Sequence, residues 1–393
     1  MSELPAGLSS REGPPPLWRE EEVFFDGDAY YQAVLRDIAA AQKHVTVEVY
    51  IFEDDAFGHD FFAALEAAAL RGVRIQMLLD GMGSHRFIQR LQVKRLPANM
   101  RVKVYNPHPW TFTYSRWQDM GRFWGSFFRR LWWINRRDHR KVITIDGVVA
   151  YIGSFNVTGE HLKAYNPRPW RDIGLRLVGD VAPILVLALL RVWSLRSYLK
   201  RKKALLGNLR ARFNHPHIRL NHSFAMRRSI YRDFLSRFNH AQERIWIQPG
   251  YFLPRRRLVR LLARAAKRGV DVRVLLSRRS DVFYYTVMQT YHLPRLIAAG
   301  VKIYIYNPTI LHAKSYIIDD TVSVGSTNLN HRSFMHDLEV DVFVQHPANR
   351  RALEANFEAM QGDATPITAE WLQQRSWWQK LAAELVFLFR HWN

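Results

Sequence analysis

One motif occurs twice in this chain of 393 residues, and it constrains the fold more than any other feature. Each copy reads His-x-Lys-x4-Asp and is followed by Gly-Ser-x-Asn. The shared positions are His139, Lys141, Asp146, Ser154 and Asn156 in the first copy, and His312, Lys314, Asp319, Ser326 and Asn328 in the second. Two complete copies predict two similar halves, each of which delivers one His, one Lys and one Asn to a shared site.

The sequence around the motifs repeats as well. Residues 71–80 and 268–277 both begin Arg-Gly-Val, which is typical of a helix end, and continue as an apolar strand. Before each of them we predict a strand and then a helix, at 44–52 and 61–70 in the first half and at 244–252 and 257–267 in the second. Strands that alternate with helices predict an α/β half with a largely parallel or mixed sheet.

Four segments follow from this repeat. We expect an N-terminal extension at 1–22, a first half at 23–206, a second half at 207–365 and a C-terminal amphipathic helix at 366–393. The halves differ in one place, because Pro107 lies 32 positions before His139 whereas Pro308 lies only 4 positions before His312. About 28 residues are therefore inserted in the first half, at 108–137.

Charge and aromatic content favour a membrane surface as the partner. The net charge of +22, from 57 basic and 35 acidic residues, indicates an anionic partner, either a nucleic acid or an acidic membrane. The 13 Trp and 23 Phe favour the membrane, since aromatic rings prefer the interface between water and lipid. The insertion combines Arg with such rings, and its candidates for membrane contact are Trp117, Trp124, Trp132 and Trp133. A core-packing helix with a basic face is the alternative for this segment.

Several kinds of segment and site are not expected. Without cysteine the chain has no disulfide, no Cys-ligated metal and no thiol nucleophile. The N-terminus lacks the pattern of a signal peptide, and the longest apolar run, residues 181–190, is shorter than the roughly 20 residues that cross a bilayer. We therefore expect no membrane span, and a buried amphipathic helix at 181–199. His215, His217 and His222 lack an acidic or Cys companion, so we expect no metal site there.

The motif residues suit the chemistry of a phosphodiester. A strand that carries His-x-Lys places both side chains on one face, and His transfers protons near neutral pH. Two Lys and two Asn would surround a phosphate group with donors, which stabilises charge in a transition state. One His can attack phosphorus while the other protonates the leaving alcohol, and this division needs neither a metal nor a cofactor.

The paired motif resembles the signature of the phospholipase D superfamily, and the resemblance covers nearly the whole chain. Residues 137–141 (Arg-Asp-His-Arg-Lys) and 248–254 (Gln-Pro-Gly-Tyr-Phe-Leu-Pro) are similar to the bacterial cardiolipin synthases of the short type, which lack N-terminal membrane spans. This resemblance implies two α/β halves related by pseudo-twofold symmetry, each with a central mixed sheet flanked by helices. It also implies phosphatidyl transfer between two phosphatidylglycerol molecules through a phosphohistidine, giving cardiolipin and glycerol. Such an enzyme would be peripheral, on the cytoplasmic side of a bacterial inner membrane.

The resemblance also implies roles for single residues. Lys141, Lys314, Asn156 and Asn328 match the family's phosphate-binding positions. Ser154 and Ser326 match its Gly-Ser positions, and we expect them to bind substrate together with the two Asn. Asp146 and Asp319 match motif aspartates that are mainly structural. We assign His139 as nucleophile and His312 as acid/base, although the symmetry of the sequence permits the reverse. The candidates that orient these two His are Asp172 and Glu339, with Asp337 and Asp341 as competitors.

Three alternatives stay open at this point. A hydrolytic phospholipase D would use the same residues with water as the acceptor, and a nuclease would use them on a nucleic-acid backbone. A membrane-binding protein without activity would not need two complete motifs. The sequence does not specify the acceptor, the acyl chains or the oligomeric state, but the site is complete within one chain.

Overall fold

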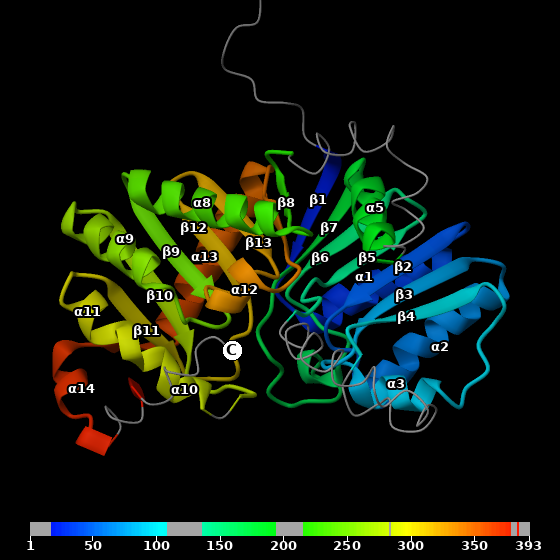
Figure 1. Cartoon of the computed structure of the whole chain (residues 1–393), viewed down its shortest axis with the longest axis horizontal. Helices are drawn as coiled ribbons and strands as arrows, with labels where there is room; N and C mark the ends of the chain where they lie inside the picture. Colours follow the sequence, from blue (N-terminus) through cyan, green and yellow to red (C-terminus); the bar gives the residue numbers. More distant parts are fainter. Residues whose placement is uncertain (1–16, 108–135, 194–214, 283, 379–382, 385–393) are drawn as a thin grey trace, which may run out of the picture.

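The computed structural model describes residues 17–107, 136–193, 215–282, 284–378 and 383–384. These residues form two α/β halves that lie side by side (Figure 1). Each half is built around one mixed β-sheet, which confirms the duplicated α/β fold predicted from the repeated motif.

In the described part of the chain, the first sheet has seven strands in the order β1-β7-β6-β5-β2-β3-β4. Strands β2, β3 and β4, at one side of this sheet, are parallel to each other, and the other neighbours are antiparallel. The strands are β1 (Trp18–Phe24), β2 (His44–Val49), β3 (Arg74–Asp80), β4 (Met100–Tyr105), β5 (Val142–Ile145), β6 (Val149–Gly153) and β7 (Gly174–Gly179). The helices of this half are α1 (Gly27–Ala40), α2 (Ala56–Leu70), α3 (His85–Leu91), the 3₁₀ turn η3 (Gly159–His161) and α5 (Val181–Trp193).

The second sheet has eight strands among the residues that the structure describes, in the order β15-β11-β10-β9-β12-β13-β14-β8. They are β8 (Ile218–Leu220), β9 (Arg244–Pro249), β10 (Asp271–Ser277), β11 (Lys302–Tyr306), β12 (Lys314–Ile318), β13 (Thr321–Gly325), β14 (Val340–Phe343) and β15 (Ala364–Ile367). The helices are α8 (Phe224–His240), α9 (Arg256–Lys267), α10 (Tyr285–Met288), η4 (Gln289–His292), α11 (Leu293–Ile297), α12 (His331–Met335), α13 (Pro347–Gly362) and α14 (Ala369–Gln373).

The two sheets share one strand order. The order β4-β3-β2-β5-β6-β7-β1 in the first half corresponds to β11-β10-β9-β12-β13-β14-β8 in the second. Strand β1 therefore matches β8, and the first repeat begins at residue 18, within the stretch that we expected to be an N-terminal extension. Strand β15 and the short helix α14 occupy the start of the expected C-terminal helix, most of whose remaining residues lie outside the described ones.

Local sequence signals explain why corresponding elements start and end where they do. Helix α2 begins five residues before the predicted position because Asp55 caps it, accepting a 2.7 Å hydrogen bond from the Gly58 N–H. After α2 and α9 the chain turns at Gly72 (φ 101°) and Gly269 (φ 93°), a left-handed conformation that favours glycine. These glycines belong to the repeated Arg-Gly-Val segments, so both halves make the same turn into β3 and β10.

One of the large apolar clusters joins the two halves. It packs Ile152 and Leu175 of the first sheet and Leu185 of α5 together with Ile317 and Val342 of the second sheet. Each half has a further cluster between its sheet and its own helices, formed by α1 and α2 in the first half and by α8 and α9 in the second. The halves thus share a core and form one body.

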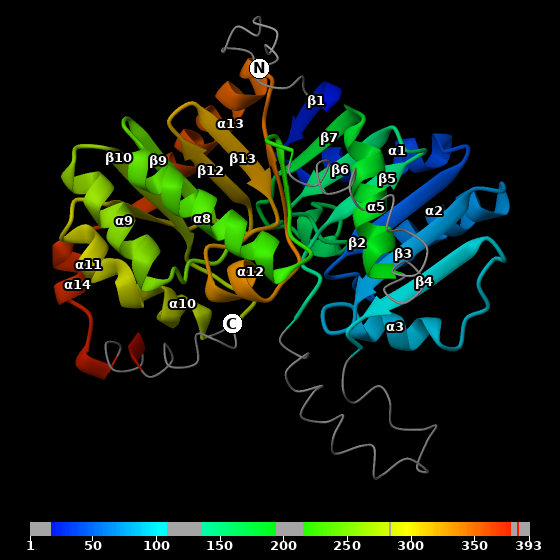
Figure 2. The same ribbon diagram turned by 45° about the horizontal axis from the view of Figure 1, so that its top comes forward.

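A buried carboxylate fastens the edge of the first sheet to the second half. Glu21 of β1 accepts hydrogen bonds from the backbone N–H groups of Gln345 and His346, just before α13, at 2.9 and 3.1 Å. Trp18 and Asn349 also donate to Glu21, at 2.8 and 3.0 Å. Figure 2 shows α13 beside β1 at this junction.

Candidate active site

The two motifs lie at corresponding places in the two sheets. His139 and Lys141 immediately precede β5, and His312 precedes β12, whose first residue is Lys314. Asn156 follows β6, and its side-chain oxygen accepts a 3.2 Å hydrogen bond from the backbone N–H of the segment after β2. Asn328 follows β13 and accepts a bond of the same length from the segment after β9. The turn after Asp319 is one residue shorter than the turn after Asp146, yet Asn328 makes the same bond as Asn156.

Backbone contacts between the halves bring the motifs together. The N–H of His139 donates to the carbonyl of Leu338 at 3.0 Å, and the N–H of His312 donates to the carbonyl of Arg171 at 2.9 Å. Each contact belongs to a short parallel bridge across the boundary between the halves. Leu338 and Arg171 are the residues just before Glu339 and Asp172, so each His meets a carboxylate of the other half.

The two orienting carboxylates are therefore exchanged between the halves. Nδ1 of His139 lies 3.0 Å from Oε2 of Glu339 and 3.0 Å from the carbonyl oxygen of Ser326. Nδ1 of His312 lies 2.8 Å from Oδ1 of Asp172. A carbonyl oxygen and an ionised carboxylate only accept hydrogen bonds, so we assign the proton of each imidazole to Nδ1. Nε2 of each ring then carries the lone pair that can attack phosphorus or accept a proton.

The competing acids contact other groups. Asp337 accepts a 3.0 Å bond from the backbone N–H of Arg137 and forms an ion pair with Arg332. Asp341 accepts bonds from the N–H and the hydroxyl of Thr327, at 3.2 and 2.6 Å. Both acids shape the surroundings of the motif and do not contact either His in the described structure.

Two buried lysines place positive charge in the site. Lys141 and Lys314 each donate to the carbonyl oxygen of the His two residues earlier, the first at 2.7 Å. Burial lowers the pKa of Lys141 to about 8 and that of Lys314 to about 7. The rings of Tyr50 and Tyr251 lie 5.2 and 6.0 Å from the two ammonium groups. Both lysines keep enough charge at neutral pH to bind an anion.

The histidines are held in the neutral form. Burial, together with the charges of Lys141 and Lys314, lowers the pKa of His139 well below its ordinary value. Burial also lowers the pKa of His312 to about 4, although Asp172 acts in the opposite direction. A neutral His beside charged lysines has a free lone pair and a place for an anion, which are the requirements of a nucleophile that attacks phosphorus.

The motif aspartates lie away from this centre. Asp146 and Asp319 adopt left-handed backbone angles (φ 53° and 48°) in the turns that follow β5 and β12. Asp146 accepts hydrogen bonds from the N–H groups of residues 42–44 at 2.7–2.9 Å, and Asp319 accepts them from residues 242–244 at 2.9–3.3 Å. These bonds fix the entry of β2 and β9, so the geometry gives both aspartates a structural role.

The serines of the two Gly-Ser segments share one contact and differ in another. Ser154 exchanges hydrogen bonds with the backbone of Ile173, donating at 3.2 Å and accepting at 3.0 Å. Ser326 makes the same exchange with the backbone of Val340, donating at 3.4 Å and accepting at 3.0 Å, and it also donates to Glu339, the acid beside His139. Both serines are fully buried. They hold the strand and the acid behind the motif, a role that differs from the predicted direct contact with substrate.

Sequence reasoning missed a group of buried charges beside the first motif. The guanidinium of Arg140 lies 2.6 Å from Glu48 and 3.2 Å from Asp138. The corresponding second-half positions hold Ala313, Gln248 and Leu311. Comparison of the aligned repeats is the signal that would have found this difference.

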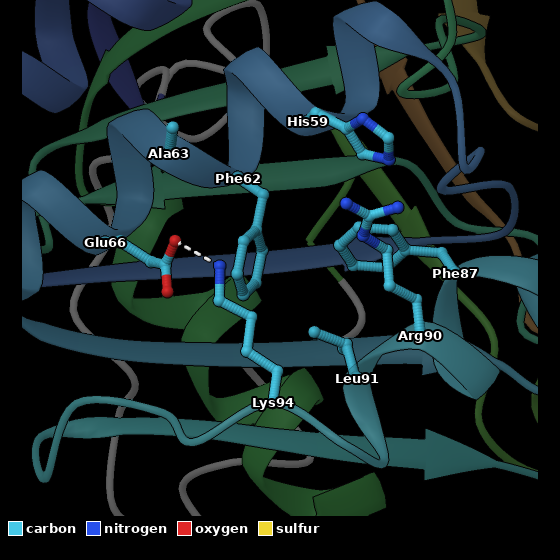
Figure 3. Close-up of a pocket in the computed structure, with 8 residues that line it drawn as sticks. All are labelled: His59, Phe62, Ala63, Glu66, Phe87, Arg90, Leu91 and Lys94. Atoms are coloured by element: carbon cyan, nitrogen blue, oxygen red, sulfur yellow. Dashed lines mark hydrogen bonds and ion pairs between the residues drawn. The ribbon is translucent and has the colours of Figure 1, made fainter.

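A small surface pocket between α2 and α3 lies apart from the motifs (Figure 3). It is lined by His59, Phe62, Ala63, Glu66, Phe87, Arg90, Leu91 and Lys94. The ammonium of Lys94 bonds to Glu66 at 2.6 Å and lies 4.7 Å from the ring of Phe62, so it is already paired. We assign no role in the reaction to this pocket.

The membrane-contact candidates Trp117, Trp124, Trp132 and Trp133 lie outside the described residues, as does most of the insertion. In the part of the chain that the structure describes, Trp377 and Trp378 stack on each other and are more than half exposed. Helix α5 confirms the first part of the helix predicted at 181–199. None of the helices among the described residues combines the length and apolar character needed to cross a membrane.

Comparison with known proteins agrees with this geometry. The sequence model of a family described as "Cardiolipin synthase, PLD-like domain" matches residues 34–166 and 234–361. Cardiolipin synthase B of Escherichia coli K12 is 28% identical over 393 residues, covering 95% of this chain and 89% of that protein. Its counterpart from Salmonella typhi is 29% identical over 396 residues, with the same coverage.

Solved structures show the same fold at low identity. Phosphatidylserine synthase from Haemophilus influenzae matches with a TM-score of 0.66 and 12% identity, over 94% of this chain and 92% of that one. Polyphosphate kinase from Porphyromonas gingivalis matches with a TM-score of 0.55 and 12% identity, over 87% of this chain and 50% of that one. The likeness extends across both halves of the present chain.

Proposed function

Because the chain belongs to the family of cardiolipin synthases with phospholipase D-like domains, we propose that it transfers a phosphatidyl group between two phosphatidylglycerol molecules. The products are cardiolipin and glycerol. The observation that carries this proposal is the pair of buried His, each backed by a carboxylate of the other half and flanked by buried lysines. This set provides a nucleophile, an acid and a binding place for one phosphate.

The first step forms a phosphohistidine. Nε2 of His139 bonds to phosphorus, and the bond between phosphorus and the glycerol oxygen breaks. Protonated His312 gives its proton to that oxygen, and glycerol leaves. The bound phosphate anion and Asp172 both favour the protonated form of His312 in this complex, while Lys141 and Lys314 stabilise the charge that develops on phosphorus.

The second step releases the enzyme. The hydroxyl of a second phosphatidylglycerol gives its proton to Nε2 of His312, its oxygen bonds to phosphorus, and the bond to His139 breaks. Water in place of the lipid alcohol would give phosphatidic acid, so the acceptor alone separates transfer from hydrolysis.

The test is the product formed from phosphatidylglycerol vesicles, identified by mass spectrometry. We expect cardiolipin and glycerol in equal amounts from the wild-type protein, and neither from His139→Ala. Phosphatidic acid as the sole product would contradict transfer and favour a hydrolase. Absence of any lipid product would overturn the proposal and make single-stranded nucleic acid the next substrate to try.

The reaction should slow at alkaline pH because the lysines lose their charge. The pKa of about 7 for Lys314 and about 8 for Lys141 apply to the free enzyme, which kcat/KM reports. Lysine is charged below its pKa, so kcat/KM should fall as pH rises through 7 and 8, with only about 1% of Lys314 charged at pH 9. Lys314→Arg should have a lower kcat/KM at neutral pH but keep that kcat/KM as the pH rises. A wild-type kcat/KM that stays constant up to pH 9 would contradict this role of the lysines.

We further propose that the enzyme is peripheral, on the cytoplasmic side of a bacterial inner membrane. The net charge of +22 and the aromatic, basic insertion support attraction to an anionic bilayer. Replacing Trp132 and Trp133 together by alanine should weaken binding to phosphatidylglycerol vesicles, measured by co-sedimentation. Turnover of a soluble short-chain substrate should stay nearly intact, and an equal loss on both substrates would instead assign this segment to the protein core.

A further inference from the structure

The residue five positions after each motif Asn makes a matched contact in both halves. In the first half this residue is His161, and in the second it is Ser333. Nε2 of His161 accepts a hydrogen bond from the backbone N–H of Asn156 at 3.1 Å. Oγ of Ser333 accepts one from the backbone N–H of Asn328 at 3.2 Å. Both side chains are buried next to the residues that we assign to phosphate binding.

The other end of each side chain reaches an orienting carboxylate. Since Nε2 of His161 is an acceptor, its proton lies on Nδ1, which is 3.0 Å from Oδ2 of Asp172. This contact is less well aligned than the 2.8 Å bond from His312 to Oδ1 of the same carboxylate. In the second half, the Ser333 side chain favours the ionised form of Glu339 and so holds the pKa of this acid lower than burial alone would, although no hydrogen bond joins the two side chains.

We propose that His161 and Ser333 are positioning residues, each of which connects the motif Asn of its own half, through a carboxylate, to the reactive His of the other half. The first series of contacts runs from Asn156 through His161 and Asp172 to His312. The second series runs from Asn328 through Ser333 and Glu339 to His139. The effect of these residues on catalysis rests on the function proposed above, whereas their effect on the two imidazoles does not.

The two series of contacts differ in rigidity. The ring of His161 packs edge-on against Phe155 and Trp170, with centroids 5.4 and 5.6 Å apart, so its plane is fixed. It contacts Oδ2 of Asp172, the carboxylate oxygen that His312 does not use. Glu339 accepts its hydrogen bond from the hydroxyl of Ser326, a single O–H group whose direction is not fixed by a packed ring.

The opposite pKa shifts of Asp172 and Glu339 support His312 as the acid/base. Burial opposes ionisation of Asp172, but its two imidazole neighbours hold the pKa of Asp172 well below its usual range. Burial raises the pKa of Glu339 above its usual range. A carboxylate that stays ionised favours a protonated imidazole more than a carboxyl group that resists ionisation. His312, which is paired with Asp172, is therefore better suited than His139 to hold a proton for the leaving glycerol.

The test compares variants that keep or remove the donor and acceptor of His161. His161→Phe keeps a ring for Phe155 and Trp170 but has neither donor nor acceptor, whereas His161→Gln keeps both. Ser333→Ala removes the matching group of the other half. His240→Gln is the control, because His240 is an exposed residue at the end of α8 whose side chain bonds only to Ser236 and Asn239 of the same helix in the described structure. The readouts are the Nδ1–H proton resonances of His312 and His139 by NMR, and kcat and KM for phosphatidylglycerol.

We expect each substitution to affect the reactive His of the other half. His161→Phe should shift the resonance of His312 and leave that of His139 in place, with kcat about 10- to 100-fold lower and KM nearly unchanged. His161→Gln should recover most of both readouts, and Ser333→Ala should shift the resonance of His139 alone. An unmoved His312 resonance in His161→Phe, or the same loss in the Gln and Phe variants, would overturn the proposal. The NMR measurement needs no substrate, so it still decides the matter if phosphatidylglycerol proves not to be the substrate.

Discussion

Replacement of His139 by alanine is expected to lower phosphatidyl transfer by at least about 10⁴-fold, because it removes the nucleophile to which we assign the covalent intermediate. The corresponding change at His312 should be equally severe with phosphatidylglycerol, whose glycerol needs a proton to leave. The two variants should differ on phosphatidyl-p-nitrophenol, since p-nitrophenolate leaves without a proton. His312→Ala should then release about one p-nitrophenolate per enzyme and stop, whereas His139→Ala should release none.

This burst decides which of the two His is the nucleophile, an assignment that the sequence left open. A burst in His139→Ala and its absence in His312→Ala would exchange the roles of the two residues. The phosphorylated peptide, identified by mass spectrometry after the burst, gives an independent answer. His240→Ala is a suitable control because this exposed residue lies at the end of α8, outside the site.

Arg140→Ala is expected to lower the free energy of unfolding by about 3–5 kcal/mol, the usual cost of breaking a buried ion pair. Arg140 is fully buried, and its guanidinium contacts Glu48 at 2.6 Å and Asp138 at 3.2 Å. Burial raises the pKa of Glu48, Arg140 opposes this, and Asp138 adds to it. Without Arg140, two buried carboxyl groups would face each other with no positive charge between them.

The second half supplies a matched control for this variant. Its corresponding positions hold Gln248, Leu311 and Ala313, and Gln248 is satisfied by Ser315 at 2.9 Å. The combination Glu48→Gln, Asp138→Leu, Arg140→Ala and Val142→Ser reproduces this neutral set in the first half, since Val142 occupies the position of Ser315. It should recover at least about half of the stability lost in Arg140→Ala, because neutral groups remove the unpaired charge. Urea unfolding followed by Trp fluorescence measures both effects, and a combined variant less stable than Arg140→Ala would contradict this account.

The sequence allowed the fold, and the residues that meet at the candidate site, to be predicted because both depend on local patterns. The repeated motif predicted the two halves, and the alternation of strands and helices predicted the α/β class. Asp172 and Glu339 were candidates from the sequence and each lies beside a histidine, but their exchange between halves could not be predicted. That exchange depends on the bridges at Arg171 and Leu338, which join segments far apart in the chain.

Other features were missed because their residue types have no characteristic local pattern. An Arg between His and Lys suggests nothing about burial, yet Arg140 is enclosed between strands with its two acids. His161 lies in a short 3₁₀ turn, and only comparison with Ser333 in the other copy shows that this position is shared. The Gly-Ser serines were expected to contact substrate, whereas their buried positions make them part of the supporting strands.

The exchanged carboxylates have a consequence for how such a protein can evolve. A polypeptide with only one of the two halves would contain a reactive His without the acid that orients it, so it could work only as a pair of identical subunits. Once two copies were fused and began to diverge, a change in the acid of one half had to suit the imidazole of the other. Selection therefore acts jointly on Asp172 and His312, and jointly on Glu339 and His139, although the two residues of each pair lie in different halves. Neither half could be lost, or replaced by that of a distant relative, without disabling its neighbour.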